Sequence, residues 1–355
     1  MTYTRQPPSS TSTPHLLPQQ DLALPLNSLI LVTGATGFIA SHVVRELLSL
    51  GFRVRGTVRS EAKGETSRGT HDHHPRYSTA VVPDVAAPDA FATAIRDVDG
   101  VVHLASDTSL ADDPDAVIPA VKAATVEVLR AAKAESSVKR VVLTSSSSAA
   151  TFPKPGVKFH ISKDTWNDEA LKVAWETPVE ERSEDPGYGF SVYAASKTAG
   201  ERAAWEFMRS EKPGFVLNAV LPNYNIGRVF RDVYPGVTGI GTIDALNGKV
   251  NTTFPPQYMI NTTDDARVHV AALIDKTVKD ERLFAFATPF NWNDMLAAIR
   301  KVRPEKKVID DFPNLGSDES TVDNERTEEL MRKWFGQGGW TSLDESVRQN
   351  LEHIE

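Results

Sequence analysis

The sequence predicts an α/β fold in which a parallel sheet is covered by helices on both faces, with a smaller lobe added toward the C-terminus. Between about residue 28 and residue 288, apolar segments of strand length alternate with segments of helical periodicity. Several apolar segments are rich in Val, Ile and Leu without polar alternation, which is typical of strands buried on both faces. This alternation favours a doubly wound parallel sheet.

The expected strands share a short apolar run bounded by polar or turn-forming residues; they are 29–33, 53–58, 79–82, 100–105, 140–145, 216–221 and 282–287. Helical periodicity is clearest over 39–50, 117–134 and 192–209. Residues 151–189, long and polar, and residues 223–258, rich in Gly and Pro, interrupt the alternation. Such insertions lie at the strand ends of α/β folds, where ligands bind.

Composition limits the classes of function. The net charge of −8 disfavours a general role in binding nucleic acid or a membrane surface. The chain has no cysteine, which excludes disulfides and thiolate metal sites, and no apolar stretch approaches the roughly 20 residues that span a bilayer. Residues 1–24, rich in Pro, Ser and Thr near the start, carry no signal-peptide pattern. We expect them to form a disordered tail and the protein to be cytoplasmic.

A glycine turn follows the first expected strand and opens a helix. Thr33, Gly34, Thr36 and Gly37 form this turn, and Phe38 and Ile39 start the helix, with the small residue Ala40 next. Glycines let the backbone turn tightly and approach a pyrophosphate, and the helix N-terminus favours the anion. The segment therefore predicts a Rossmann-type dinucleotide site. Residues 25–222 are assigned to this domain, with 261–288 returning to it; 223–260 and 289–355 are assigned to a substrate-side lobe.

The second expected strand ends before Arg59, with Lys63 four residues later. A site that prefers NAD has an acid here for the ribose 2′-hydroxyl, whereas a guanidinium makes charge-assisted bonds to a 2′-phosphate. These cations therefore predict NADPH. We also assign to the cofactor Asp84 and Val85 after the third strand, and the small residues Ala105 and Ser106 after the fourth; the adjacent His103 is interpreted as a core histidine.

Tyr193 and Lys197 are the main candidates for catalysis. A spacing of four residues on a helix places both on one face. A nearby ammonium lowers the pKa of a phenol, so we expect Lys197 to lower the pKa of Tyr193. Tyr193 would then protonate a substrate carbonyl oxygen, and Lys197 would hold the nicotinamide ribose. A serine hydroxyl at the end of the fifth strand would donate to the same oxygen, but the run of serines at 145–148 leaves its position open.

These segments together resemble the extended short-chain dehydrogenases/reductases, and more narrowly the fungal NADPH-dependent aldehyde and carbonyl reductases related to dihydroflavonol reductases. The matching segments are 32–42, 54–60, 138–146, 193–198 and 217–224. The resemblance implies that Ser146 is the catalytic serine beside Tyr193 and Lys197, and that Ser145, Pro222 and Asn223 border the cofactor. Ala124-Thr125 departs from the Gly-Thr of many relatives, and the tract at 71–74 adds histidines to a loop.

We therefore expect NADPH-dependent reduction of aldehydes or ketones, with a small-molecule substrate and no need for a metal. A nucleotide-sugar epimerase or dehydratase is the first alternative, since it would use the same Tyr and Lys. A cofactor-sensing regulator without chemistry is the second, although such proteins tend to lose the Tyr/Lys pair. The substrate, the product stereochemistry and the choice between monomer and homodimer are not determined by the sequence.

Overall fold

The computed structural model describes residues 18–354, and its centre is a parallel sheet of seven strands. These strands are β1 (Leu29–Thr33), β2 (Arg53–Val58), β3 (Tyr77–Val81), β4 (Gly100–His103), β5 (Arg140–Thr144), β7 (Val216–Pro222) and β10 (Arg282–Ala285). Their spatial order is β10-β7-β5-β4-β1-β2-β3. The direction of winding reverses between β1 and β4, which is where ligands bind in such sheets. The predicted Rossmann-type sheet is confirmed, with strand ends that differ from the prediction by at most two residues.

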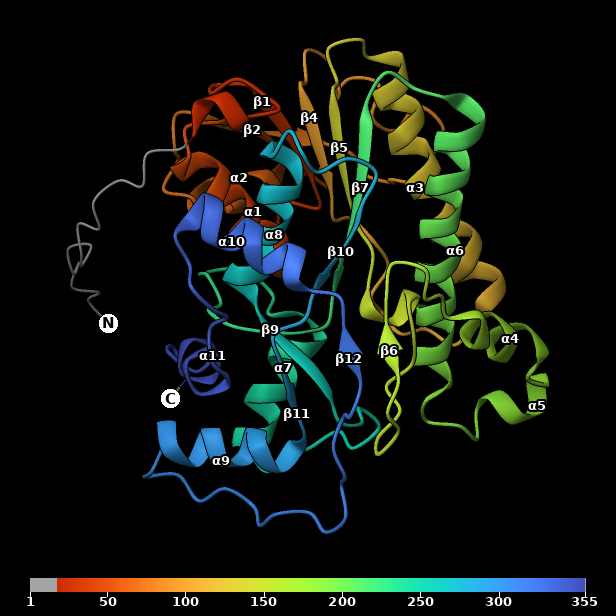
Figure 1. The fold of residues 1–355 in the computed structure, drawn as a ribbon, viewed down its shortest axis with the longest axis vertical. Helices are drawn as coiled ribbons and strands as arrows, with labels where there is room; N and C mark the ends of the chain where they lie inside the picture. The colour runs from red at the N-terminus through yellow and green to blue at the C-terminus, as the bar shows by residue number, and fades with distance from the viewer. Residues whose placement is uncertain (1–17, 355) are drawn as a thin grey trace.

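Helices cover both faces of the sheet (Figure 1). On one face lie α3 (Pro114–Ala134) and α6 (Tyr188–Glu211), and on the other lie α1 (Phe38–Ser49) and α8 (Thr262–Ile274). Successive side chains of β1 point to opposite faces of the sheet and therefore pack with different helices. Ile30 and Val32 pack with α1 and α8, whereas Leu29 and Leu31 pack with α3 and α6. Because both sets are buried, β1 has no polar face, as the sequence predicted for several of the strands.

Local signals explain where the two long helices begin and end. Asp113 caps the N-terminus of α3, accepting hydrogen bonds from the backbone N–H groups of residues 115 and 116, and Pro114 occupies its first position. The helix α6 ends at Lys212, which has a left-handed backbone with φ of 42°. Between the sheet strands, α2 (Glu61–Thr70) packs on β2 and β3. These helices hold fixed the loops that follow the strands.

A second, smaller sheet forms the centre of the lobe. Its strands are β8 (Tyr224–Ile226), β9 (Gln257–Asn261) and β11 (Thr288–Phe290), with β9 in the middle. The helices α7 (Gly236–Leu246), α9 (Trp292–Val302) and α11 (Leu343–Asn350) share its apolar core. Figure 1 shows this lobe at the end of the sheet where β7 continues into β8. The lobe therefore faces the carboxyl ends of the strands.

The segment predicted to be irregular, 151–189, contains short regular elements. They are β6 (His160–Ile161), α4 (Asp168–Glu176), α5 (Val179–Arg182) and the first residues of α6; one-turn helices occur at Gln19–Asp21 and Ser147–Ala149. The strand β6 pairs with β12 (Thr321–Val322) from the C-terminal segment. Elements this short depend on tertiary partners, which explains why no periodic pattern marks them.

Two boundaries differ from the sequence prediction. The helix α10 (Glu325–Phe335) was placed in the lobe, but its Leu330, Met331 and Trp334 pack in the core shared by β1, α1 and α8. The predicted tail extends to residue 24, yet Leu24 is buried and the backbone N–H of Ala23 donates to Ile274. Apolar contact and backbone pairing order this short segment despite its polar surroundings. Residues 18–22 are also described and include the one-turn helix Gln19–Asp21, while residues 1–17 of the predicted tail lie outside the described residues.

Two further features can be stated for residues 18–354. No helix in this part of the chain is long and apolar enough to cross a membrane. The same residues contain no group of three or more His, Asp or Glu side chains arranged to hold a metal ion. In the histidine tract, His71 is buried against Tyr77 with ring centroids 5.0 Å apart, and burial lowers its pKa to about 4. It is therefore a core residue.

Candidate active site

The glycine turn is built as a close approach of two strand ends. Gly34 has a φ of 65°, and a Cβ atom on it would lie 3.1 Å from the Cα atom of Ala105. Only glycine meets both demands without strain. Its backbone N–H donates to the Thr57 hydroxyl at 3.1 Å, and Gly37 donates to the Gly34 carbonyl at 2.9 Å. The turn is thus fixed before any ligand binds.

The N-terminus of α1 follows this turn without a side-chain cap. Its N-cap residue is Gly37, and no described side chain accepts a hydrogen bond from the first turn there. The first N–H groups of a helix need acceptors and attract anions. Thr36 and Ile39 are partly exposed beside them, while Phe38 is buried. This donor set fits the pyrophosphate of a dinucleotide.

Thr33 has a structural role that the sequence prediction did not anticipate. Its hydroxyl accepts hydrogen bonds from the backbone N–H groups of Leu104 and Ala105 and pairs with His103 Nδ1 at 2.9 Å. Thr33 is fully buried. Burial lowers the pKa of His103 to about 3, so this histidine is neutral, as its interpretation as a core residue implies. Together these bonds hold the end of β4 against the glycine turn.

At the end of β2 the two predicted cations stand free of protein partners. Arg59 and Lys63 are exposed, and neither side chain forms a hydrogen bond or ion pair with any residue from 18 to 354. Ser60 caps α2 between them by accepting from the backbone N–H of Lys63 at 3.3 Å. The capped helix fixes the backbone from which both cations extend. An unpaired arginine at this strand end fits a 2′-phosphate.

The structure places the other predicted cofactor residues at the ends of neighbouring strands. Asp84 is exposed after β3 and accepts from the Ala86 N–H at 2.9 Å, with Val85 beside it. Ala105 and Ser106 follow β4 and are partly exposed. Because parallel strands end at one edge of the sheet, these residues lie along the same edge as the glycine turn.

Pro222 and Asn223 close this edge on the other side. Pro222 ends β7, and Asn223 leads into β8 of the lobe, where its side chain accepts from the Tyr224 N–H at 2.9 Å. The adjoining residue Val220 accepts a hydrogen bond from the Ser145 N–H. Pro222 and Asn223 therefore lie beside the serine run.

Tyr193 faces the serine run from α6. Its pKa is raised by burial of the hydroxyl group, and a hydrogen bond with the side chain of Ser146 opposes that increase. The Ser146 hydroxyl also accepts from Ser148 Oγ at 2.9 Å and from the Ser148 N–H at 3.2 Å. Ser146 is thus held in place by its own loop. The structure pairs Tyr193 with the serine that the resemblance indicated.

The expected electrostatic effect of Lys197 on Tyr193 is not found. The pKa of Tyr193 lies above its ordinary value rather than below it, because loss of hydration outweighs the hydrogen bond with Ser146. Lys197 itself donates to the Thr144 carbonyl at 2.9 Å and to the Ser106 hydroxyl at 3.4 Å. Burial lowers the pKa of Lys197 to about 8, against an opposing effect of Glu201.

Ser145 occupies a different environment from Ser146. Its hydroxyl donates to Glu201 at 2.6 Å in a buried position. Thr144, the residue before it, pairs through its own hydroxyl with His269 Nε2 at 2.9 Å. Both hydrogen-bond donors of Ser145 are therefore engaged within the protein, the hydroxyl with Glu201 and the backbone N–H with Val220.

Glu201, His269 and Arg282 are buried parts of the site that sequence reasoning missed. A signal existed for Glu201, because it continues the spacing of Tyr193 and Lys197 along one face of α6. His269 and Arg282 belong to α8 and β10, 68 and 81 residues after Glu201 in the chain. No local pattern links them to the site.

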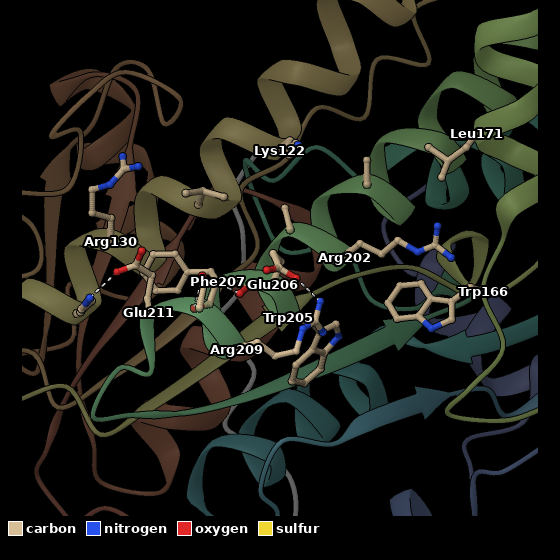
Figure 2. Close-up of a pocket in the computed structure, with 15 residues that line it drawn as sticks. Lys122, Arg130, Trp166, Leu171, Arg202, Trp205, Glu206, Phe207, Arg209 and Glu211 are labelled. Atoms are coloured by element: carbon tan, nitrogen blue, oxygen red, sulfur yellow. Dashed lines mark hydrogen bonds and ion pairs between the residues drawn. The ribbon is translucent and has the colours of Figure 1, made fainter.

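A surface hollow lies elsewhere. It follows the outer side of α3 and α6 and is lined by charged and aromatic residues such as Arg130, Trp205 and Arg209 (Figure 2). None of Ser146, Tyr193 and Lys197 lines it. A much smaller cavity lies between Lys197, Ser106 and Glu201. This outer hollow is therefore separate from the candidate catalytic residues.

Comparisons with known proteins agree with this geometry. The model of the NAD dependent epimerase/dehydratase family matches residues 30–225. The chain is 40% identical to aldehyde reductase 2 of Sporidiobolus salmonicolor, over 92% of this chain and 95% of that protein. It is 39% identical to the NAD-dependent epimerase/dehydratase terH of Aspergillus terreus, over 93% and 97%.

Among solved structures, the chain is similar to yeast methylglyoxal/isovaleraldehyde reductase Gre2 complexed with NADPH. The TM-score is 0.78 with 25% identity, over 92% of this chain and 98% of that one. These similarities extend over more than nine tenths of the chain, and they therefore include the glycine turn, the seven sheet strands and the helix that carries Tyr193 and Lys197. The chain belongs to the NAD dependent epimerase/dehydratase family, the extended branch of the short-chain dehydrogenases/reductases.

Proposed function

We propose that this protein reduces aldehydes or ketones to alcohols with NADPH. The observation that carries the proposal is the convergence, at one edge of the sheet, of Ser146 and Tyr193 with Lys197 and the uncapped N-terminus of α1. Two relatives described above are named as reductases of aldehydes or of methylglyoxal, and one of them is complexed with NADPH. Both names fit a small carbonyl substrate.

The cofactor would lie across the strand ends. The glycine turn and the first turn of α1 would hold the pyrophosphate, Arg59 and Lys63 the 2′-phosphate, and Lys197 the nicotinamide ribose. When bound, NADPH supplies the hydride that adds to the carbonyl carbon. The free cations at the end of β2 support NADPH over NADH, because that strand end carries no acid for a ribose 2′-hydroxyl.

The chain's own groups would handle the oxygen atom of the substrate. Ser146 would donate a hydrogen bond to the carbonyl oxygen and so stabilise the charge that develops there. Tyr193 would give its proton to the same oxygen as general acid. Its raised pKa suits this role, because the phenol remains protonated at neutral pH. Lys197 would therefore serve mainly to bind the ribose and to orient it beside Tyr193.

The test is the oxidation of free NADPH, followed by absorbance, with a panel of aldehydes, keto esters and aryl ketones. We expect turnover with NADPH and much less with NADH. A second candidate, an epimerase or dehydratase, is favoured by the name of one relative. Such an enzyme would purify with tightly bound cofactor and would not consume NADPH. Bound NAD together with no net NADPH oxidation across the panel would overturn the reductase proposal.

A further inference from the structure

Glu201 is a buried carboxylate that neither the glycine turn nor the Tyr193–Lys197 pair accounts for. It is 1% exposed and lies on α6, one helical turn after Lys197. Its oxygens accept hydrogen bonds from Ser145 Oγ at 2.6 Å and from Trp205 Nε1 at 3.0 Å. Arg282 adds two more, from Nε at 2.7 Å and from Nη2 at 3.2 Å. A charge buried at this depth requires such compensation.

These partners connect Glu201 to the serine run at the end of β5 and to the loop before α4. Ser145 precedes Ser146, whose side chain meets Tyr193. Arg282 also donates through Nη1 to the carbonyl oxygens of Lys163 and Thr165, each at 2.7 Å, and its guanidinium lies 4.0 Å from the ring centroid of Trp166. Residues 163–166 belong to the loop before α4. The carboxylate thus links this loop to the end of β5.

Glu201 also faces Lys197. Both residues line the small cavity that includes Ser106 and Ser145, and their spacing places them on one face of α6. Glu201 raises the pKa of Lys197 and so opposes the effect of burial. Arg282 also forms an ion pair with the Glu201 carboxylate. Glu201 raises the pKa of Lys197 despite this second pairing.

We propose that Glu201 is a positioning residue of the reductase site, which supplies the counter-charge of Lys197 and fixes the end of β5 through Ser145. The inference rests on the proposed function, because it assumes that Lys197 holds the cofactor ribose. Glu201 acts through these neighbours and does not touch the substrate. Without its charge, Lys197 would lose its proton at a lower pH, and the cofactor would lose a cationic donor.

Other ionisable groups lie around Lys197, and α3 contributes only Val121 and Thr125 to the same cavity. These groups are Tyr193 on α6, His103 on β4, His269 and Asp265 on α8 behind Thr144, and Arg282 on β10 behind Glu201. His103 is neutral because burial lowers its pKa to about 3. Glu201 is therefore the acid whose charge Lys197 meets most directly.

The experiment compares wild type with Glu201→Gln, which keeps the shape of the side chain but removes its charge. The Kd for NADPH is measured by fluorescence titration from pH 6 to pH 10, and kcat/KM is measured with one carbonyl substrate. Removing an opposite charge at close range moves a pKa by about 1–3 units. We therefore expect the alkaline loss of NADPH affinity to begin about one pH unit lower in the variant. The difference should be largest between the two pKa values of Lys197. Near pH 7.5 the kcat/KM for NADPH should fall about twofold relative to wild type, and the two profiles should converge toward pH 6 and toward pH 10.

A matched control is available on the same helix. Glu206 is exposed and pairs only with Arg209 among the described residues, so Glu206→Gln should leave the pH profile unchanged. Glu201→Gln leaves Arg282 buried without its partner and threatens folding. The double variant Glu201→Gln/Arg282→Met removes both charges and should show the same alkaline shift. Near-ultraviolet circular dichroism establishes that each variant is folded.

The outcomes separate the two proposals. Wild-type protein that binds no NADPH would overturn the reductase function and this inference with it. A wild type that binds NADPH, together with Glu201→Gln and double-variant profiles that superimpose on it, would overturn the inference alone. A uniform loss at every pH with no shift of the alkaline limb would also reject it, because that result indicates a purely structural role.

Discussion

The carboxyl ends of β5 and β2 border the same crevice but are built in opposite ways. At β5, Ser146, Tyr193 and Lys197 are engaged by hydrogen bonds within the protein. At β2, Arg59 and Lys63 extend into solvent without a partner among residues 18–354. A buried group has a fixed geometry and an altered pKa, whereas an exposed cation contributes only its charge and reach. Changes to Ser146 and Tyr193 should therefore affect rate, and changes to Arg59 and Lys63 should affect affinity.

The largest effect should come from Tyr193→Phe. This change keeps the ring and its packing against Phe190, with centroids 6.2 Å apart, but removes the proton. General acid catalysis supplies about 10²–10⁴-fold, so kcat should fall on that scale. The Kd for NADPH should change less than threefold, because Lys197 remains in place. The measurement is steady-state kinetics alongside a binding titration. Retention of most carbonyl-reducing turnover would refute Tyr193 as the acid.

Ser146→Ala should have the next largest effect. Removal of one donor to a developing oxyanion costs about 10²–10³-fold in kcat. The Ser146 hydroxyl meets Tyr193, whereas the Ser145 hydroxyl is committed to Glu201. Ser145→Ala should therefore reduce kcat less than Ser146→Ala does. If side-by-side measurements show a larger loss of kcat for Ser145→Ala, then Ser145 and not Ser146 is the oxyanion donor.

The sequence predicts the region around β2 more completely than the region around β5. The glycine turn, Arg59 and Lys63 follow directly from local order, because each comes at the end of a recognisable strand. At β5, the local pattern does not distinguish the four serines. The family resemblance indicates Ser146, and the fold gives Ser145 and Ser146 different partners. Arg282 reaches Glu201 across 81 positions of the chain. Such a contact has no local signature.

The pKa of Tyr193 illustrates the same limit. From the sequence, Lys197 is a cation one helical turn away and should lower the pKa of the phenol. In the fold, the phenol loses its hydration and Lys197 is turned toward Thr144 and Ser106, so the pKa rises instead. Burial is a tertiary property, and its effect on a pKa exceeds that of a neighbour inferred from spacing.

At β2, Arg59→Ala should weaken NADPH binding with little effect on kcat. Hydrogen bonds to charged groups contribute about 1.5–3 kcal/mol, or roughly ten- to a hundredfold in Kd. The Kd for NADH should change less than threefold, since NADH has no 2′-phosphate. Titrations with both cofactors provide the measurement. An equal loss of affinity for NADPH and NADH would show that Arg59 does not contact the 2′-phosphate. The end of β2 would then have no specific role in NADPH affinity.

The smallest effect should come from the titration of Lys197 in the wild type. As the pH rises, this titration should lower the affinity for NADPH and raise the free energy of unfolding. Burial lowers the folded-state pKa of Lys197 to about 8, while an unfolded lysine keeps its proton up to about 10.5. Above pH 8 the folded protein loses a cationic donor, so NADPH affinity should fall about fivefold, the difference between a charged and a neutral hydrogen bond. Over the same interval the unfolded chain binds more protons than the folded one. Linkage then requires the contribution of Lys197 to the free energy of unfolding to rise with pH, by up to about 3 kcal/mol.

Lys197→Met isolates this contribution from the other groups that titrate in the same range. The difference in unfolding free energy between wild type and Lys197→Met, measured by urea denaturation without cofactor, should favour the variant below pH 8. That difference should shrink as the pH rises toward 10. Methionine has no ionisable proton, so the unfolding free energy of Lys197→Met as a function of pH provides the baseline. A difference that stays constant with pH would mean that Lys197 keeps its ordinary pKa in the fold. The alkaline loss of affinity would then have to arise from another group at the end of β5.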